Sequence, residues 1–340
     1  MKNWLLKFFS LLRYLLPKNI GNRFLIVSTT GLGDTLWGTP AIRALRKTYP
    51  GAYIGVLTTP LGKEVLKNNP HIDEFFVLRH LPIFSLLALL SHLRRRRIAK
   101  IFIFHTSQRP ILPFCTWLGA SHIVATAGIN KGLDSLLTQP MPAKRQHEIQ
   151  RRLEIVGCFG DVSMEIFPSS ASPLQETSPP IPVVGLHPGA KDLFKQWPPS
   201  HFIALGNRLK DHLGCHIVVT GGPEEKELVT KIVRGIEGAK AMTAPLSISD
   251  LAALIQQMAL LVTNDTGPMH IACAVKTPAL ALFCPTDPIL CGPYHVPKSR
   301  ILQKPITCTP CLKKKCRDPF CMRQIGIEDA FQNSLALFYG

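Results

Sequence analysis

Charged residues follow glycines at the ends of several apolar runs, and the first such place is the stretch GLGDTLWGTPAIRAL, residues 31–45. Gly31 and Gly33 permit a tight turn and a close approach of the backbone to a ligand. Asp34 then opens an amphipathic segment that we expect to be a helix reaching about Lys47. Its carboxylate either caps that helix or acts as a general base that takes a proton from an incoming hydroxyl. The pattern does not fit the dinucleotide fingerprint G-x-G-x-x-G.

The loop HPGAKDLFKQWP, residues 187–198, follows another apolar run. Gly189 frees the backbone, and Lys191 and Lys195 supply two cations. This combination suits a diphosphate group. The alternative is a solvated loop with ordinary lysines.

The stretch TGGPEEKE, residues 220–227, repeats the order of strand, glycines and helix. Gly221 and Gly222 form its turn, and two carboxylates follow at Glu224 and Glu225. These carboxylates either cap the helix or bind ribose hydroxyl groups.

A third loop of this kind is NDTGPMH, residues 264–270. Asp265 and Thr266 precede the flexible Gly267, and a proline then marks the first turn of a helix. The amino end of that helix offers unpaired N–H groups to an anion. His270 lies about one turn further along, and a lone histidine is more often a structural hydrogen-bonding residue than a catalyst.

These loops need a scaffold, and the sequence alternates strand-like and helix-like segments throughout. This alternation predicts an α/β fold with doubly wound parallel sheets. The expected strands are 23–29, 52–59, 74–78, 100–105, 122–128, 183–190, 215–222, 260–265 and 279–285, and the expected helices are 61–69, 83–99, 199–212, 223–236, 249–257 and 268–275.

Residues 168–182 are rich in Pro and Ser and lack periodicity, so we interpret them as a linker. Two domains that face each other across a cleft carry their strand-end loops on both walls, where ligands of open α/β sheets bind. The organisation we expect is an N-terminal amphipathic helix, a Rossmann-like domain, the linker, a second Rossmann-like domain and a C-terminal helix, over residues 1–20, 21–167, 168–182, 183–325 and 326–340.

Lys and Arg outnumber Asp and Glu by 39 to 22, which gives a net charge of +17. Such an excess favours nucleic acid, an anionic membrane surface or a phosphorylated substrate as partner. The sequence contains no helix-turn-helix, RNA-recognition or zinc-finger pattern, so nucleic acid rests on charge alone. We therefore expect no nucleic-acid partner.

Two segments suit a membrane surface. Residues 1–20 have one apolar and one basic half, which is typical of a helix lying in a membrane interface. The alternative is a helix packed on the protein's own surface. Residues 81–97 combine an apolar run with four arginines, and their alternative is an ordinary half-buried helix. The longest apolar run, 81–93, is shorter than the roughly 20 residues that a spanning helix needs.

The chain has ten cysteines, and six of them stand scattered among apolar residues, as reduced thiols do in a cytosolic protein. The other four run C-x2-C-x4-C-x4-C. A four-thiolate zinc site is one interpretation, and reduced structural thiols or a redox-labile disulfide are the others. The four are Cys308, Cys311, Cys316 and Cys321.

Taken together, these motifs resemble glycosyltransferase family 9, the lipopolysaccharide heptosyltransferases, over about residues 23–325. The resemblance is carried, in chain order, by STTGLGDTLWGTPAIRAL, LHPGA with KQWP, TGGPEE, NDTGPMHIACAVKTPALALFCPTDP and the cysteine-rich end. The resemblance implies a GT-B fold with an N-terminal acceptor domain and a C-terminal nucleotide-sugar domain. It implies ADP-heptose as donor, the inner core of lipid A as acceptor, and a place at the cytoplasmic face of an anionic inner membrane.

The resemblance also implies roles for single residues, without a metal or other cofactor. Asp34 deprotonates the acceptor hydroxyl, and the anomeric configuration inverts. Lys195, Thr266 and Gly267 stabilise the departing diphosphate, Asp265 contacts the donor sugar, and Glu225, rather than its neighbour Glu224, binds ribose. The other candidate substrate-binding residues are Thr30, Gly31, Gly33, His187, Gly189, Gly221, Gly222 and His270.

Two further hypotheses stay open at this stage. One is a family 9 transferase that uses another nucleotide sugar or acceptor, because the motifs do not fix the sugar. The other is a non-catalytic nucleotide-sugar-binding paralogue, against which the joint presence of Asp34, Lys195 and Asp265 argues.

Overall fold

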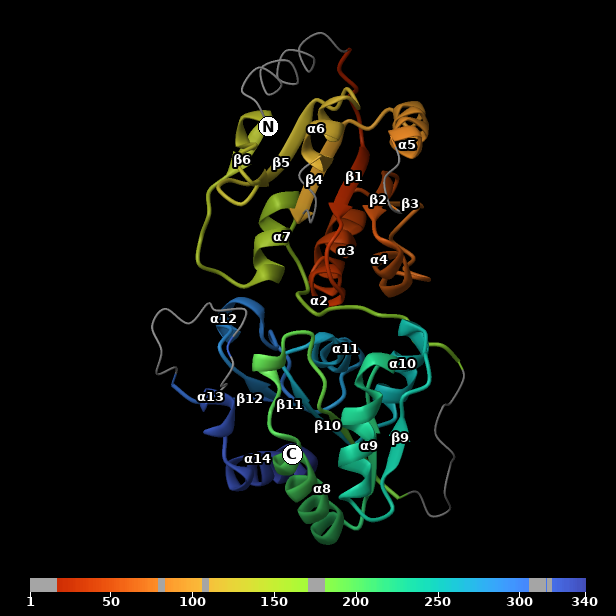
Figure 1. Ribbon diagram of the computed structural model, residues 1–340. Coiled ribbons are helices and arrows are strands. Elements are labelled where there is room, and N and C mark those ends of the chain that lie inside the picture. The colour runs from red at the N-terminus through yellow and green to blue at the C-terminus, as the bar shows by residue number, and fades with distance from the viewer. Residues whose placement is uncertain (1–16, 79–82, 106–109, 171–180, 306–315, 317–319) are drawn as a thin grey trace. The chain divides into compact units, whose positions relative to one another are not determined.

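The chain forms two compact units, residues 1–164 and 165–340, in the computed structural model shown in Figure 1. The structure describes residues 17–78, 83–105, 110–170, 181–305, 316 and 320–340, without the side chains of 83–87. Each unit is built around one parallel sheet of six strands. The α/β class expected from the alternating sequence is therefore confirmed.

The sheet of the first unit has the strand order β3-β2-β1-β4-β5-β6. This order reverses direction between β1 and β4, which is where open α/β sheets bind their ligands. Apolar side chains fill both faces of β1 because helices cover both. The strands are β1 Arg23–Ser28, β2 Tyr53–Thr58, β3 Glu74–Val77, β4 Lys100–His105, β5 His122–Thr126 and β6 Gln139–Met141.

Helices cover both faces of this sheet (Figure 1). On one face Leu25 and Val27 of β1 pack with buried residues of α5 and α6. On the other, the ring of Phe24 meets that of Tyr49, just after α3, at 5.3 Å between centroids. The helices are α2 Leu32–Leu36, α3 Thr39–Thr48, α4 Pro60–Val65, α5 Ile83–Arg95, α6 Ile111–Thr116 and α7 Glu148–Val156, with a 3-10 turn η1 at Asp134–Leu136.

The single helix expected from Asp34 to about Lys47 is wrong in one respect, because it is broken into α2 and α3. Pro40 stands in the first turn of α3 and has no N–H to continue a helix from α2. A Cβ at Gly38, between the two helices, would lie only 3.1 Å from both the Phe104 ring and the Thr35 carbonyl oxygen. The break thus lets the chain pass close to β4.

The sheet of the second unit has the order β12-β11-β10-β7-β8-β9, which is the same doubly wound topology. The direction reverses between β7 and β10, so the loops that follow these strands lie at the ligand-binding edge. The strands are β7 Val183–His187, β8 His216–Thr220, β9 Lys240–Met242, β10 Leu260–Asn264, β11 Ala279–Phe283 and β12 Ser299–Gln303.

The helices of the second unit close a core that includes Trp197, Phe202 and Met322, all nearly inaccessible to solvent. The C-terminal helix contributes Ala330, Phe331 and Leu337 to the same core. The helices are α8 Pro199–Leu213, α9 Lys226–Arg234, α10 Ile248–Gln256, α11 Gly267–Val275, α12 Pro288–Cys291, α13 Phe320–Arg323 and α14 Ile327–Tyr339, with 3-10 turns η2 Leu193–Lys195 and η3 Pro223–Glu225.

Two sequence-based expectations lie largely outside the described residues. Most of the expected N-terminal helix, 1–20, falls on residues 1–16, and its last four residues, 17–20, are described and not helical. Most of the expected linker falls on residues 171–180. Within the part of the chain that the structure describes, none of the helices combines the length and apolar character needed to cross a bilayer.

Candidate active site

Asp34 is the third residue of α2, the helix that begins just beyond the carboxyl end of β1. The N-cap of α2 is Gly31, whose carbonyl oxygen accepts hydrogen bonds from the Thr35 backbone N–H and hydroxyl. The interpretation of Asp34 as an N-cap is therefore wrong. Its side chain is 30% exposed, so the carboxylate can meet a ligand. Thr30, which precedes this turn, has a buried hydroxyl group.

A buried arginine on α7 faces Asp34. The guanidinium of Arg152 is wholly buried, and its Nη2 lies 3.4 Å from Asp34 Oδ1. The guanidinium carbon lies 5.4 Å from the centre of the Trp37 ring and 6.0 Å from that of Phe104. Aromatic faces attract a guanidinium and fix its plane. Arg152 is thus a rigid cation beside the carboxylate.

Glu148, one turn earlier on α7, binds Arg152 more closely than Asp34 does. Arg152 Nη1 donates to Glu148 Oε2 at 2.5 Å and to the Glu148 carbonyl oxygen at 2.9 Å. Arg151 Nη2 pairs with the same carboxylate oxygen. Burial raises the pKa of Glu148, but Arg152 and Arg151 outweigh it and hold that pKa below its usual value. Glu148 is therefore an anion between two cations.

His105 ends β4 next to this cluster. Burial lowers its pKa, the Asp34 carboxylate opposes that effect, and Arg152 and Arg151 lower it further. The neutral ring therefore dominates near pH 7. Its Nδ1 is buried without a hydrogen-bond partner among the described residues.

The sequence analysis missed His105, Glu148, Arg151 and Arg152. One signal was available for the histidine, because it ends the apolar run KIFIFH at the carboxyl end of a strand. The segment HEIQRR looks like a solvated helix face with ordinary charge pairs. Only the packing of α7 against β4, β5 and α3 buries its arginines.

In the second unit, Lys195 and Asp265 form an ion pair. Lys195 Nζ lies 2.6 Å from Asp265 Oδ2, and the two side chains are 20% and 7% exposed. Lys195 ends η2 after β7, and Asp265 follows β10, so the pair joins the loops of the two adjacent strands at the switch point. Lys191 lies exposed in the same loop.

Asn264, which the sequence analysis did not single out, holds these two loops together. Its side chain is fully buried. Oδ1 accepts from the Trp197 backbone N–H at 3.1 Å, and Nδ2 donates to the Pro188 carbonyl oxygen at 2.8 Å. The position of Lys195 is therefore fixed from both sides of its loop.

The choice between Glu224 and Glu225 has a structural basis. Glu224 is exposed, whereas the carboxylate of Glu225 turns toward the loop after β7. Glu225 Oε2 accepts from the Gly222 N–H at 2.9 Å. A Cβ on Gly189 would stand 1.9 Å from Glu225 Oε1, so a side chain at this position would displace this carboxylate.

The amino end of α11 completes this group of loops. Thr266 is its N-cap in extended conformation and makes no side-chain capping bond, and the helix starts at Gly267. Pro268 has no N–H and the Met269 N–H donates to the Thr266 carbonyl oxygen at 3.2 Å, so the first turn of this nine-residue helix offers the Gly267 N–H and the positive end of the helix dipole. His270 lies within α11 and is 4% exposed.

A pocket of about 200 Å³ lies beside these loops. His187 and Thr220 form one part of its wall, with His187 Nδ1 2.9 Å from Thr220 Oγ1. Burial lowers the pKa of His187, although Glu225 opposes this, so the ring is neutral near pH 7. Gly221, Gly222 and Pro223 continue the wall, and the remainder is apolar, from Met242, Ala244, Pro245, Leu246 and Leu251. The largely apolar lining suits a heterocyclic base.

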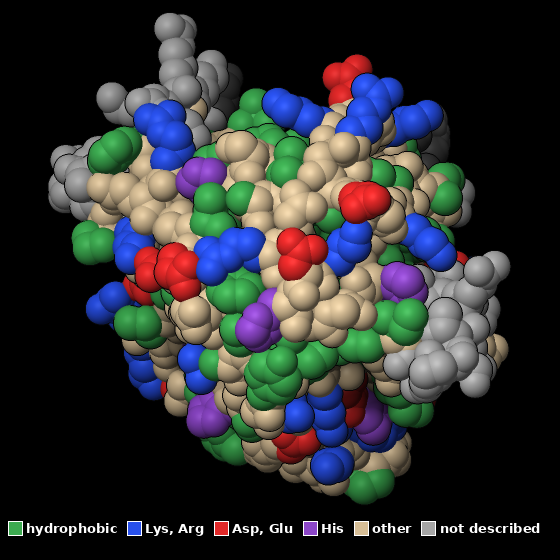
Figure 2. All heavy atoms as spheres, turned by 90° about the horizontal axis from the view of Figure 1, so that it is seen from below, with side chains coloured by type: hydrophobic (Ala, Val, Ile, Leu, Met, Phe, Trp, Pro, Cys, Tyr) green, Lys and Arg blue, Asp and Glu red, His purple; other side chains and the backbone are tan. Residues whose placement is uncertain are grey.

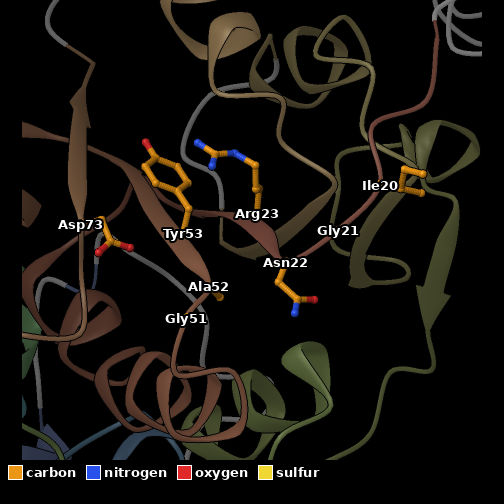
Figure 3. A pocket seen from close by; sticks show the side chains of 8 residues that line it. All are labelled: Ile20, Gly21, Asn22, Arg23, Gly51, Ala52, Tyr53 and Asp73. Atoms are coloured by element: carbon orange, nitrogen blue, oxygen red, sulfur yellow. The ribbon is translucent and has the colours of Figure 1, made fainter.

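A larger and more open pocket, of about 540 Å³, lies in the first unit, at the amino ends of the strands of its sheet (Figure 3). The beginnings of β1 and β2 line it, with Arg23 stacked on the Tyr53 ring at 4.5 Å. Asp34 follows the other end of β1. This pocket therefore takes no part in the chemistry of Asp34.

The cysteine cluster, for which a zinc site is one interpretation, lies only partly within the described residues. Cys308 and Cys311 lie outside the described residues, Cys316 is half-buried, and Cys321 packs into the core of the second unit. Among the described residues no group of three or more His, Cys, Asp or Glu side chains is arranged to hold a metal ion.

The basic excess is not gathered on the face drawn in Figure 2. There, Lys and Arg side chains are interspersed with acidic and apolar ones. Nucleic-acid-binding domains usually gather basic side chains on one face or along one helix. This face does not have that pattern.

Two doubly wound units define the class of protein: one presents a carboxylate after its first strand, and the other an ion-paired lysine, glycine turns and an open helix end. Two doubly wound units of this kind are typical of the GT-B fold. The sequence profile of glycosyltransferase family 9 (heptosyltransferase) matches residues 138–320, more than half of the chain, and the chain belongs to this family.

Curated relatives are heptosyltransferases. The chain is 26% identical to lipopolysaccharide heptosyltransferase 3 of Escherichia coli, over 77% of this chain and 83% of that protein. It is 25% identical to lipooligosaccharide heptosyltransferase 2 of Campylobacter jejuni, over 90% and 95%. These relatives agree with the membership of family 9.

Solved structures share the fold. The family 9 glycosyltransferase of Veillonella parvula matches with a TM-score of 0.80 and 22% identity over 94% of this chain and 97% of that one. The E. coli heptosyltransferase WaaC with ADP matches with a TM-score of 0.74 and 18% identity, over 93% and 99%. The expected GT-B fold is confirmed.

Proposed function

We propose that this enzyme transfers a heptose from ADP-heptose to the inner core of lipid A and inverts the anomeric configuration, with Asp34 as general base. The observation that carries this proposal is the carboxylate of Asp34, partly exposed at the switch point of the first sheet and held by a buried arginine. Membership of the heptosyltransferase family supports the choice of sugar.

The second unit takes the donor in this proposal. The apolar pocket beside His187 receives the adenine, and Glu225 accepts hydrogen bonds from ribose hydroxyls. The amino end of α11 and Lys195 receive the diphosphate, because both supply positive charge. The relative that was solved with ADP supports a nucleotide of this kind.

Lys195 and Asp265 change partners when the donor binds. In this structure they neutralise each other at 2.6 Å. With donor, Lys195 turns to the diphosphate, and Asp265 becomes free to accept from a hydroxyl of the sugar. One residue thus serves the leaving group and the other serves the transferred group.

The reaction balances without a further reactant. The acceptor oxygen attacks the anomeric carbon from the face opposite the diphosphate, the bond between that carbon and the phosphate oxygen breaks, and ADP leaves with the electron pair. Asp34 takes the acceptor proton. Negative charge accumulates on the departing phosphate, and the Lys195 ammonium and the amino end of α11 stabilise it.

A membrane surface fits the end of the first unit where strands β1 and β4 begin. Asn19 Nδ2 donates to the carbonyl oxygens of Ile98 and Leu118, which fixes the point where the amphipathic segment 1–16 meets the fold. Ile20 beside it is 87% exposed. The exposed Arg94, Arg95 and Arg97 follow at the end of α5. We propose that this edge lies on the anionic cytoplasmic leaflet.

Mass spectrometry tests the reaction. The enzyme is incubated with ADP-heptose and a series of truncated lipid A cores, and one acceptor is expected to gain the mass of one heptose. No gain on any acceptor with ADP-heptose, combined with transfer from another nucleotide sugar, supports instead a family member with a different donor. Donor binding without any transfer supports the non-catalytic alternative.

A further inference from the structure

We propose that Arg152 and Glu148 are positioning residues for Asp34: Arg152 orients the Asp34 carboxylate, and Glu148 offsets the charge of Arg152 so that Asp34 remains an effective base. This inference rests on the proposed role of Asp34 as the base.

The distances show an unequal sharing of Arg152. Its contact with Asp34 Oδ1 is 3.4 Å, beyond the usual range of an N–H···O bond, whereas its contacts with Glu148 are 2.5 and 2.9 Å. Asp34 is therefore oriented but not locked in a tight salt bridge. Asp34 Oδ2 lies 3.8 Å from the place where a Cβ of Gly31 would stand, and because Gly31 has no side chain this oxygen keeps room for a hydroxyl.

The surroundings of Arg152 make its charge effective. The guanidinium is fully buried between the Trp37 and Phe104 rings, and Nε has no hydrogen-bond partner among the described residues. A buried charge is weakly screened and acts strongly on its neighbours. An uncompensated Arg152 would therefore hold Asp34 in its ionised form and make it a poor proton acceptor.

Glu148 provides that compensation. The described charged and titratable groups around Asp34 are Glu148, Arg151 and Arg152 on α7 and His105 on β4. With His105 neutral, the two guanidinium groups balance the carboxylates of Asp34 and Glu148. Loss of the Glu148 charge leaves one excess positive charge beside Asp34, and loss of the Arg152 charge leaves one excess negative charge.

The two losses therefore have opposite consequences for the pH dependence of kcat/KM. A neighbouring charge at 4–6 Å shifts a carboxyl pKa by about one to three units. With Glu148→Gln, the acid limb of the profile is expected to move to lower pH by about one unit, and the plateau falls because the base is weaker. With Arg152→Met, the same limb is expected to move to higher pH by about one unit. Opposite shifts cannot arise from a general loss of stability.

Two further variants complete the experiment. Arg43→Met removes another buried arginine of the same unit, which pairs with Asp161, and it is expected to leave the limb in place. The double variant Glu148→Gln/Arg152→Met leaves no excess charge, so its limb returns to within about half a unit of the wild type while kcat stays low. Because it buries no unpaired charge, it also covers the case in which a single variant does not fold.

The outcomes separate this inference from the function on which it rests. If Asp34→Asn abolishes transfer but neither Glu148→Gln nor Arg152→Met moves the acid limb, or both move it in the same direction, the positioning role is wrong and the base stands. If Asp34→Asn transfers normally, the proposed base is wrong, and the positioning role falls with it.

Discussion

Replacement of Lys195 by methionine tests the donor side of the site most informatively, because the change has two separable effects. Methionine keeps most of the volume and removes the charge. The diphosphate loses its only side-chain cation in the proposed arrangement. At the same time Asp265, with a side chain 7% exposed, loses its ion-pair partner.

The two effects have different magnitudes. A charge-assisted hydrogen bond is worth about 1.5–3 kcal/mol, and Lys195 must leave Asp265 to make it, so we expect ADP to bind about 10- to 100-fold more weakly. An unpaired, largely buried carboxylate destabilises the fold, here by about 2 kcal/mol since Lys195 is partly exposed. The second effect lowers the melting temperature of the free enzyme.

The double variant Lys195→Met/Asp265→Asn separates them. Asparagine leaves no buried charge, so the melting temperature is expected to return most of the way to that of the wild type, while ADP affinity stays low. Isothermal titration with ADP measures the affinity, and calorimetry measures the stability. An ADP affinity within twofold of the wild type in Lys195→Met would refute the assignment of Lys195 to the diphosphate.

Three other predictions concern the glycine loop, a buried histidine and the membrane edge. Gly189→Ala places a methyl group 1.9 Å from Glu225 Oε1 and displaces that carboxylate, so ADP-heptose should bind at least tenfold more weakly. Gly214→Ala, the control, has open space around its Cβ and should lower only stability, so equal donor affinity in both variants contradicts the packing argument. Burial lowers the pKa of His187, so below the ordinary pKa of about 6.5 the unfolded chain binds more protons than the folded one, and stability should fall as the pH drops below 6.5. In urea titrations, the loss of stability between pH 7.5 and pH 5.5 should be smaller for His187→Gln than for the wild type. An equal loss in both proteins counts against a neutral buried His187. Flotation with anionic vesicles should weaken when residues 1–16 are deleted or when Arg94, Arg95 and Arg97 become glutamates, but not when Lys226 and Lys231 on α9 do; binding that survives the first two changes excludes the proposed membrane edge.

The sequence predicted the parallel sheets and the loops at their carboxyl ends because both depend on local pattern. Apolar runs such as RFLIVS and LLVTN form strands β1 and β10 where expected. Asp34, Lys195 and Asp265 follow such strands, so their place near the switch points could be inferred from topology. The three-residue strands β6 and β9 carry too little periodicity for such an inference.

The missed part of the site depends on tertiary packing. Glu148, Arg151 and Arg152 form an ordinary charged pattern in the sequence, and burial turns them into a charge network around Asp34. The sequence did not distinguish an N-cap from a general base at Asp34, and the structure excludes the N-cap because Gly31 occupies that position. The preference for Glu225 over Glu224 as the ribose-binding residue likewise depends on tertiary packing, because the Glu225 carboxylate lies against Gly189.

The central claim is that Asp34 accepts the acceptor proton and does not hold the donor. Its most direct test compares Asp34→Asn with the wild type in two measurements, the affinity for ADP-heptose and the rate of heptose transfer followed by mass spectrometry. We predict an affinity within about twofold and a rate lower by about 10²- to 10⁴-fold, the usual contribution of a general base. Transfer at the wild-type rate, or a loss confined to donor affinity, would contradict the account.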